Sequence, residues 1–202
     1  MNKARLEEII RVDHAGEHGA TSIYKGTLDI LNLFGDEETI SIIQDMAEGE
    51  KKHVKEFNRL IKDKSIRPTA LLPIWKIAGY SLGALSAIHG KNAIMVCTEA
   101  VEEVIDKHYS DQIEELEQSG EEESLLNSIR EFHAEEVEHE MIAREEMDEI
   151  SPMMNIFKDV VKIGCKTAGT LSISIIVIWL LVKIFKIQSI SLSVNTSFGS
   201  YT

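Results

Sequence analysis

The sequence predicts an all-α protein, a four-helix bundle with additional apolar helices. Only three Pro and twelve Gly interrupt a chain of 202 residues rich in Glu, Lys, Leu, Ile and Ala, which favour helix over strand. Four long segments carry apolar residues at steps of three and four, the spacing of one buried helical face. Two further segments, 71–90 and 167–185, are largely apolar. A chain of this length can bury one substantial core.

The first two helices are predicted over residues 3–33 and 36–63, with a Gly ending the first and an Asp capping the second. The first places Glu17 on its buried stripe. The second places Glu50 and His53 where Leu or Val is expected. An isolated polar group there costs about 2–5 kcal/mol unless it is paired. These side chains are therefore expected to have partners.

The third segment, residues 74–89, is made of apolar and small residues, with Lys76 as its only formal charge. It follows two prolines and could cross over the bundle or lie on a bilayer. The fourth helix is predicted over residues 92–118, and its apolar stripe includes Glu102. A polar residue again stands where the core is expected.

The fifth helix is predicted over residues 122–150 and repeats the pattern of the second, with Glu136 and His139 on its stripe. A Ser-Pro pair then opens a sixth helix that runs into the apolar tail. We expect a bundle domain over residues 1–172 and an apolar extension over residues 173–202.

A repeated Glu-x-x-His motif predicts a two-metal site. Each copy follows a single inward Glu on another helix, at a distance of 33 or 34 residues. Residues three apart share a helical face, so the Glu and His of one motif can reach one metal. This set is the ligand arrangement of di-iron and di-manganese proteins of the ferritin-like class. Oxygen and imidazole donors without thiolates suit such metals, and we expect two Fe ions per chain. The candidate ligands are Glu17, Glu50, His53, Glu102, Glu136 and His139.

The alternative is that these residues lie on solvated Glu-Lys faces of surface helices. That would require the hydrophobic stripes to lie elsewhere, which they do not. Helical phase favours Glu102 over its acidic neighbours, and Glu136 over Glu135 and Glu138. Glu99, one turn before Glu102, could lie beside the ligands or be an additional one.

The roles of other polar residues near the apolar stripes remain open. Asp13 could orient a metal-bound His by accepting its second N–H, or be an ordinary helix-side acid. Tyr24 and Tyr109 lie on inner faces, where a role in the aromatic core is favoured over contact with the site. The five other histidines are expected at the surface or core edge: His14, His18, His89, His108 and His133.

Composition limits the partners. A net charge of −13 disfavours nucleic acid, which needs clustered Lys and Arg, and four ligand carboxylates would balance two divalent cations. The two Cys are far apart and offer no disulfide framework, which favours a reducing compartment. The N-terminal residues carry no export signal.

Two apolar stretches raise the question of a membrane. Residues 71–90 include several Gly and Ser besides Lys76, so a helix on the bilayer surface or beside an apolar pocket fits better than a span. The tail over residues 167–185 could be an anchor, an interfacial helix or a buried element. An interfacial or inserted tail is favoured because the bundle is complete without it.

The motif RVDHAGEHGA at residues 11–20 resembles the opening signature of the demethoxyubiquinone hydroxylases, the di-iron monooxygenases of late ubiquinone biosynthesis. The resemblance covers about residues 5–172, and the metal ligands of the family fall on the same six positions. Further matches are EKKH at 50–53, RPT at 67–69, LGA at 82–84, CT at 97–98, AVEE at 100–103, HY at 108–109 and EEVEH at 135–139.

The resemblance implies hydroxylation at position 3 of a polyprenyl demethoxy-benzoquinol, using O2 and external electrons. It also implies that His108 and Tyr109 assist electron delivery, with NADH a proposed donor. Members are peripheral membrane proteins, so membrane lipid and other ubiquinone-biosynthesis proteins are expected partners. The expected location is the cytoplasmic face of a bacterial membrane, with the tail as a candidate anchor. Family members end soon after the position of Ser172, so the membrane mode of this longer chain stays open.

Two other functions remain as alternatives. A ferritin-like iron or peroxide-handling protein would share the ligand set, but such proteins commonly form soluble shells, against which the apolar segments argue. A helical membrane protein without catalysis would fold without metal.

Overall fold

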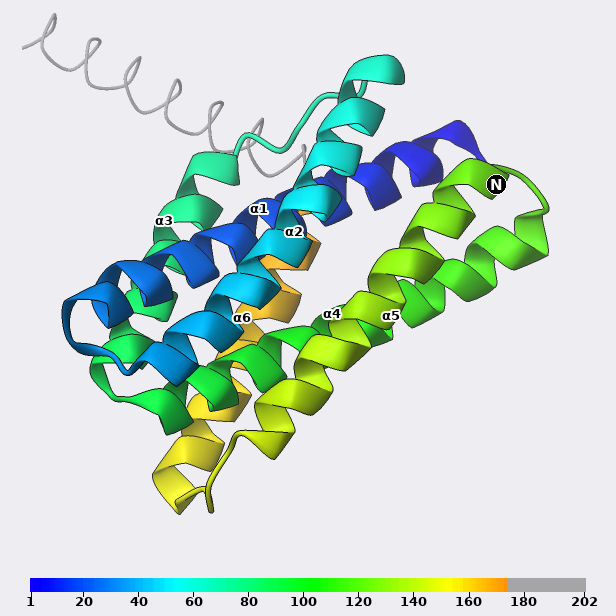
Figure 1. Cartoon of the computed structure of the whole chain (residues 1–202). Coiled ribbons are helices and arrows are strands. Elements are labelled where there is room, and N and C mark those ends of the chain that lie inside the picture. The colour runs from blue at the N-terminus through cyan, green and yellow to red at the C-terminus, as the bar shows by residue number, and fades with distance from the viewer. Residues whose placement is uncertain (174–202) are drawn as a thin grey trace, which may run out of the picture.

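The computed structural model describes residues 1–173, and within them the prediction of an all-α protein is confirmed (Figure 1). These residues form six helices and no strand. The helices are α1 (Lys3–Phe34), α2 (Glu37–Asp63), α3 (Leu72–Ile88), α4 (Lys91–Ser119), α5 (Glu123–Glu145) and α6 (Pro152–Ile173). The predictions for the tail beyond residue 173 concern residues outside the described range.

Four of these helices, α1, α2, α4 and α5, form the bundle (Figure 1). Helix α1 packs along α2, and α4 packs along α5. Helix α3 lies mainly against α1 and connects α2 to α4, while α6 lies mainly against α4. The third segment is therefore the long crossover connection of the bundle, one of the two positions that its sequence allowed.

The helix ends follow the local sequence. The Asp36 side chain accepts a hydrogen bond of 2.8 Å from the backbone N–H of Thr39 and so caps α2 as predicted. Ser151 caps α6 in the same way. The prediction that α5 continues to Ile150 is wrong, because α5 ends at Glu145. Residues 146–151 are needed to turn the chain toward α6, and Asn92 accepts a hydrogen bond from this turn.

Glycines bring α3 unusually close to α1. A Cβ at Gly83 would lie 1.9 Å from the carbonyl oxygen of Ile23, and one at Gly26 would lie 2.1 Å from the carbonyl oxygen of Tyr80. No side chain fits at either contact. The glycines that made residues 71–90 a poor membrane span therefore serve the packing of α3 on the bundle.

The core consists of apolar clusters, two of which lie toward opposite ends of the bundle helices. One contains Ile9, Ile10, Phe57, Leu60, Ile66, Tyr109, Leu116, Leu125, Leu126, Ile129 and Phe132. The other contains Tyr24, Leu31, Ile43, Met46, Ala87, Ile94, Met95 and Ala143. On each bundle helix, the predicted ligands fall between the residues of the two clusters. The site therefore lies mid-bundle, with apolar packing on both sides.

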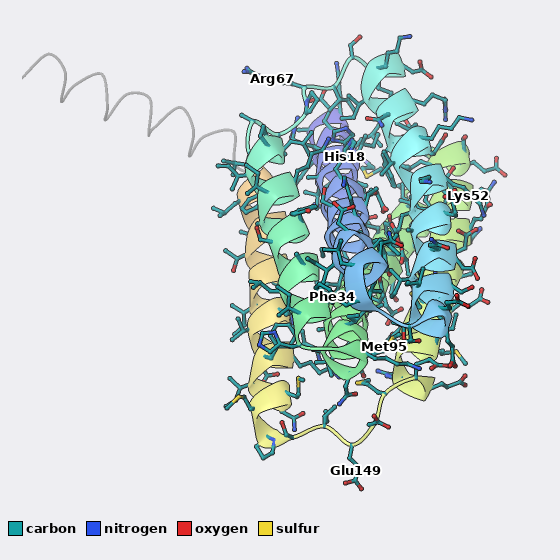
Figure 2. All side chains as sticks on the ribbon, turned by 60° about the vertical axis from the view of Figure 1, so that its left-hand side comes forward. His18, Phe34, Lys52, Arg67, Met95 and Glu149 are labelled. Carbon is teal, nitrogen blue, oxygen red and sulfur yellow. The ribbon has the colours of Figure 1, made fainter. Side chains whose placement is uncertain are left out.

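Helices α3 and α6 leave apolar side chains exposed. They lie side by side (Figure 2), and the Trp75 Nε1–H donates a 3.0 Å hydrogen bond to the Ser172 hydroxyl between them. Within residues 1–173, no helix is long and apolar enough to cross a membrane. The exposed residues are Ile74, Ile77, Leu85 and Ile88 on α3, and Met153, Ile156, Val160 and Ile163 on α6.

Candidate metal centre

The bundle brings all six predicted ligands together in its interior. Five of them are no more than 2% exposed, and His139 is 8% exposed. Helices α1 and α4 each supply one Glu, and α2 and α5 each supply a Glu and a His. The Glu-x-x-His spacing places both side chains of each motif on the buried face, one turn apart.

The donor atoms form two overlapping groups. One consists of Glu17, Glu50, His53 and Glu136, and the other consists of Glu50, Glu102, Glu136 and His139. Within each group, one ligand atom of every residue lies within 4.8 Å of the others. Glu50 and Glu136 belong to both groups, so their carboxylates can bridge two metal ions.

The histidines face the bridging carboxylates through Nδ1. His53 Nδ1 lies 3.1 Å from Glu136 Oε1, and His139 Nδ1 lies 3.4 Å from Glu136 Oε2. Each oxygen of Glu136 thus points to a different half of the site. His53 Nδ1 also lies 3.3 Å from Glu17 Oε2. Both imidazoles therefore offer the same ring nitrogen toward the centre.

The donor set fits two divalent metals because its inward atoms lack other partners. Eight buried ligand atoms have no hydrogen-bond partner among the described residues. Leaving a buried polar atom unsatisfied costs about 1–3 kcal/mol. Eight such atoms in one place therefore indicate that these atoms bind metal cations. They are Glu17 Oε2, both Glu50 oxygens, His53 Nδ1, Glu102 Oε2, both Glu136 oxygens and His139 Nδ1.

Electrostatics lead to the same conclusion. Burial raises the pKa of Glu17 and of Glu102 well above the usual value. Burial also acts to raise the pKa of Glu136, but the facing imidazoles outweigh it and lower that pKa to about 2. Burial acts to lower the pKa of His139, but the facing carboxylates raise it to about 9. Without metal, protons on the histidines supply the positive charge that divalent cations would otherwise bring.

Two buried tyrosines, one on α1 and one on α4, each donate a hydrogen bond to the Glu ligand on the other of these two helices. The Tyr24 hydroxyl on α1 donates a 2.8 Å hydrogen bond to Glu102 Oε1 on α4. The Tyr109 hydroxyl on α4 donates to Glu17 Oε1 on α1. Each tyrosine lies seven residues after the Glu of its own helix and contacts the Glu of the other. Both belong to the core, as favoured from the sequence, but that interpretation missed their contact with the ligands.

Replacing Tyr24 by Phe is expected to lower metal affinity about 10–100-fold, because hydrogen-bond partners of metal ligands typically contribute that much. The ring keeps its packing and only the hydroxyl is lost, which leaves Glu102 free to rotate. Tyr109→Phe should act similarly through Glu17. Competition of Mn²⁺-loaded protein with a metal chelator measures the loss, and Tyr80→Phe, at a partly exposed tyrosine of α3, is the control. An unchanged affinity in both core variants would contradict the prediction.

The structure also identifies the residue that orients His53. Its Nε2 lies 3.1 Å from Glu135 Oε2. Asp13 does not contact a ligand histidine, so that alternative is wrong. Its Oδ1 instead accepts a 2.8 Å hydrogen bond from Gln112 and lies 3.2 Å from His108 Nε2. Helical phase places Glu135 beside the ligand stripe and not on it, so the sequence does not predict Glu135 as a ligand. A residue that orients a ligand from the neighbouring helix has such a position.

Glu99 lies outside both ligand groups. Its carboxylate pairs with Arg144 at 2.9 Å and with Lys158 at 2.6 Å, so it ties α4 to α5 and α6. The five other histidines also lie outside the groups, as expected. The expected position at the surface or core edge is wrong for His14, which is buried and lies 3.0 Å from Asn58 Oδ1.

Comparison with known proteins gives the same family as the motif at residues 11–20. The chain is 44% identical over 173 residues to a mitochondrial protein of Dictyostelium discoideum named NADPH-dependent 3-demethoxyubiquinone 3-hydroxylase, covering 85% of this chain and 78% of that protein. The Homo sapiens protein of the same name is 41% identical over 174 residues, covering 85% and 79%. A Rhodospirillum rubrum protein named 3-demethoxyubiquinol 3-hydroxylase is 38% identical over 165 residues, covering 82% and 76%.

The family described as "Ubiquinone biosynthesis protein COQ7" matches residues 4–172. The match includes all six candidate ligands and both tyrosines, and it ends before the apolar extension. The chain belongs to the COQ7 family of ubiquinone biosynthesis proteins.

Proposed function

We propose that this protein is a 3-demethoxyubiquinol 3-hydroxylase, an O2-dependent monooxygenase of ubiquinone biosynthesis with two iron ions per chain. The observation that carries the proposal is the pair of overlapping ligand groups joined by Glu50 and Glu136, in a chain related to hydroxylases of that name. The substrate is a polyprenyl benzoquinol that lacks the substituent at ring position 3. We also propose that residues 1–172 form the catalytic domain.

The six ligands are shared between two metal positions. Glu17 and His53 would hold one ion, Glu102 and His139 the other, and Glu50 and Glu136 both. When bound, the irons would supply the activation of O2, from which one oxygen atom enters the ring and the other leaves as water. Oxygen and nitrogen ligands without thiolates suit iron in this role.

The protein surrounds this chemistry with apolar packing and oriented ligands. The apolar clusters exclude bulk water from the two ends of the site, which strengthens the electrostatic interactions within. The crossed tyrosines keep the single-Glu carboxylates oriented. Because these hydroxyls are neutral donors, they also hold protons next to the ligand oxygens.

Electrons must come from an external donor, since the reaction consumes two. The mitochondrial relatives are named NADPH-dependent, which supports a reduced nicotinamide nucleotide, NADH or NADPH, for this chain. We propose that His108 and Tyr109 assist delivery. They are adjacent on α4, Tyr109 donates to Glu17, and the side chain of His108 is 42% exposed. The pair therefore connects a ligand to the protein surface.

The function is tested by expressing the chain in a bacterial strain that lacks its own demethoxyubiquinol hydroxylase. We expect the extracted demethoxyubiquinone to disappear and ubiquinone to form. Purified protein supplied with NADH or NADPH should convert a short-chain demethoxyquinol, with one O2 and one reduced nicotinamide nucleotide consumed per product. A soluble cage that oxidises Fe(II) equally with and without quinol would instead favour the ferritin-like alternative.

We also propose that the protein lies on the membrane surface, where its substrate resides. Helices α3 and α6 lie side by side (Figure 2), and both expose large apolar side chains, which supports this proposal. Large apolar side chains exposed together are typical of contact with lipid or protein. For a bacterial chain, this surface is the cytoplasmic face of the cell membrane, where other ubiquinone-biosynthesis proteins can join it.

Replacing Ile77 by Glu is expected to weaken binding to lipid vesicles about 10–100-fold. Ile77 is 70% exposed, so its loss leaves the fold intact while removing about 1.5–3 kcal/mol of burial in lipid. Cosedimentation with phospholipid vesicles measures the change. Met141→Glu is the control, because Met141 is 54% exposed on α5. Equal weakening by both substitutions would argue against a specific membrane face.

A further inference from the structure

The two halves of the metal centre differ at one pair of matching positions. The residue before the ligand Glu is Gly49 in the α2 motif and Glu135 in the α5 motif. Because the two motifs face each other, each of these positions lies beside the ligand histidine of the opposite helix. The repeat is therefore symmetric in its ligands and asymmetric next to them.

On the α5 side, a carboxylate holds the ligand histidine. Glu135 Oε2 lies 3.1 Å from His53 Nε2, and Glu135 Oε1 accepts a 3.2 Å hydrogen bond from Lys52, which Figure 2 labels on α2. The side chain of His53 is fully buried. Donation from Nε2 fixes the tautomer that leaves Nδ1 free for a metal, and a carboxylate partner strengthens the imidazole as a ligand.

On the α2 side, a glycine replaces that carboxylate. A Cβ at Gly49 would lie 3.4 Å from both Nε2 and Cε1 of His139 and 3.7 Å from Glu135 Oε2, so the ring edge lies against the glycine with the Glu135 carboxylate close by. Within residues 1–173, no protein group is hydrogen-bonded to His139 Nε2. Gly49 and His139 both line a surface pocket of about 760 Å³ between α2 and α5. This ring edge is therefore open to the pocket.

We propose that the two metal positions are inequivalent: the ion held by Glu17 and His53 is retained, and the ion held by Glu102 and His139 exchanges through the pocket beside Gly49. The inference rests on the metal centre of the proposed function. The bridging carboxylates belong to both positions and cannot cause the difference. It arises because the Nε2 of His53 has a carboxylate partner, while the Nε2 edge of His139 has none and borders the pocket.

Iron release tests the proposal. Protein loaded anaerobically with two equivalents of Fe(II) is mixed with excess coloured Fe(II) chelator, and absorbance follows the release. We expect two phases of one iron each, with rates at least about tenfold apart. Glu135→Ala should accelerate the slow phase about 10–100-fold and leave the fast phase unchanged. Glu135→Gln should fall between, because its amide oxygen still accepts the hydrogen bond.

The converse substitution adds the missing partner. Gly49→Asp should slow the fast phase, since its carboxylate can reach the exposed edge of His139. Gly49→Ala adds a comparable Cβ without a carboxylate and separates the effect of bulk. Glu131→Gln removes an exposed charge from α5 outside the pocket and should leave both phases as in the parent protein. Circular dichroism verifies that each variant is folded, and the Gly49 pair decides the question if Glu135→Ala is not.

Two irons that leave at one rate would overturn the inference while leaving the metal centre standing. So would a Glu135→Ala variant in which only the fast phase accelerates. Failure of the parent protein to bind about two irons would overturn both this inference and the proposed function.

Discussion

Replacing Glu136 by Ala is expected to remove both metal retention and hydroxylation. Glu136 has one oxygen toward each half of the centre, so its loss opens both metal positions at once. Losing a mere partner of a ligand typically costs 10–100-fold, so losing a bridging ligand should lower turnover of demethoxyquinol by more than about 100-fold. Elemental analysis of the purified variant and extraction of its quinone products measure the two effects.

The matched control is Glu138→Ala, two residues further along α5. Glu138 is exposed and belongs to neither ligand group, so metal content and turnover should stay at the parent values. A Glu136→Ala variant that keeps two metals and converts the quinol would refute the assignment of the centre.

Metal loading is expected to raise the melting temperature by about 8–16 °C. A ligand that binds only the folded state at 1,000 times its dissociation constant adds about 4 kcal/mol, and each kcal/mol shifts the melting temperature of a chain of this size by about 2–4 °C. The physical cause is the cluster of four buried carboxylates, whose mutual repulsion the cations remove. Calorimetry with Mn²⁺, and again after chelation, measures the shift.

The Glu136→Ala variant provides the comparison for this shift. It keeps the fold but loses the bridge, so Mn²⁺ should raise its melting temperature far less than that of the parent protein. Equal melting temperatures for metal-free and metal-loaded parent protein would favour a helical protein that folds and acts without metal.

Helical periodicity was sufficient to predict the helices and their inward residues. The period of an α-helix determines which side chains share a face, so Glu50 and His53 could be placed on a buried stripe without knowing what they face. The same holds for the single Glu of α1 and of α4. The predicted helix ends were wrong where the chain reverses direction, as at the end of α5. The number of residues that such a turn needs depends on where the next helix packs.

The sequence by itself therefore determined the all-α fold, the family and the six inward residues. Tertiary structure alone decided what surrounds them. Tyr24 contacts a ligand 78 residues away, and Glu135 lies beside His53 from 82 residues away. Such contacts depend on which helices face each other and on their rotation, which no local pattern specifies. The Glu-x-x-His repeat looks symmetric in the sequence, and only helix packing makes Gly49 and Glu135 the point at which its halves differ.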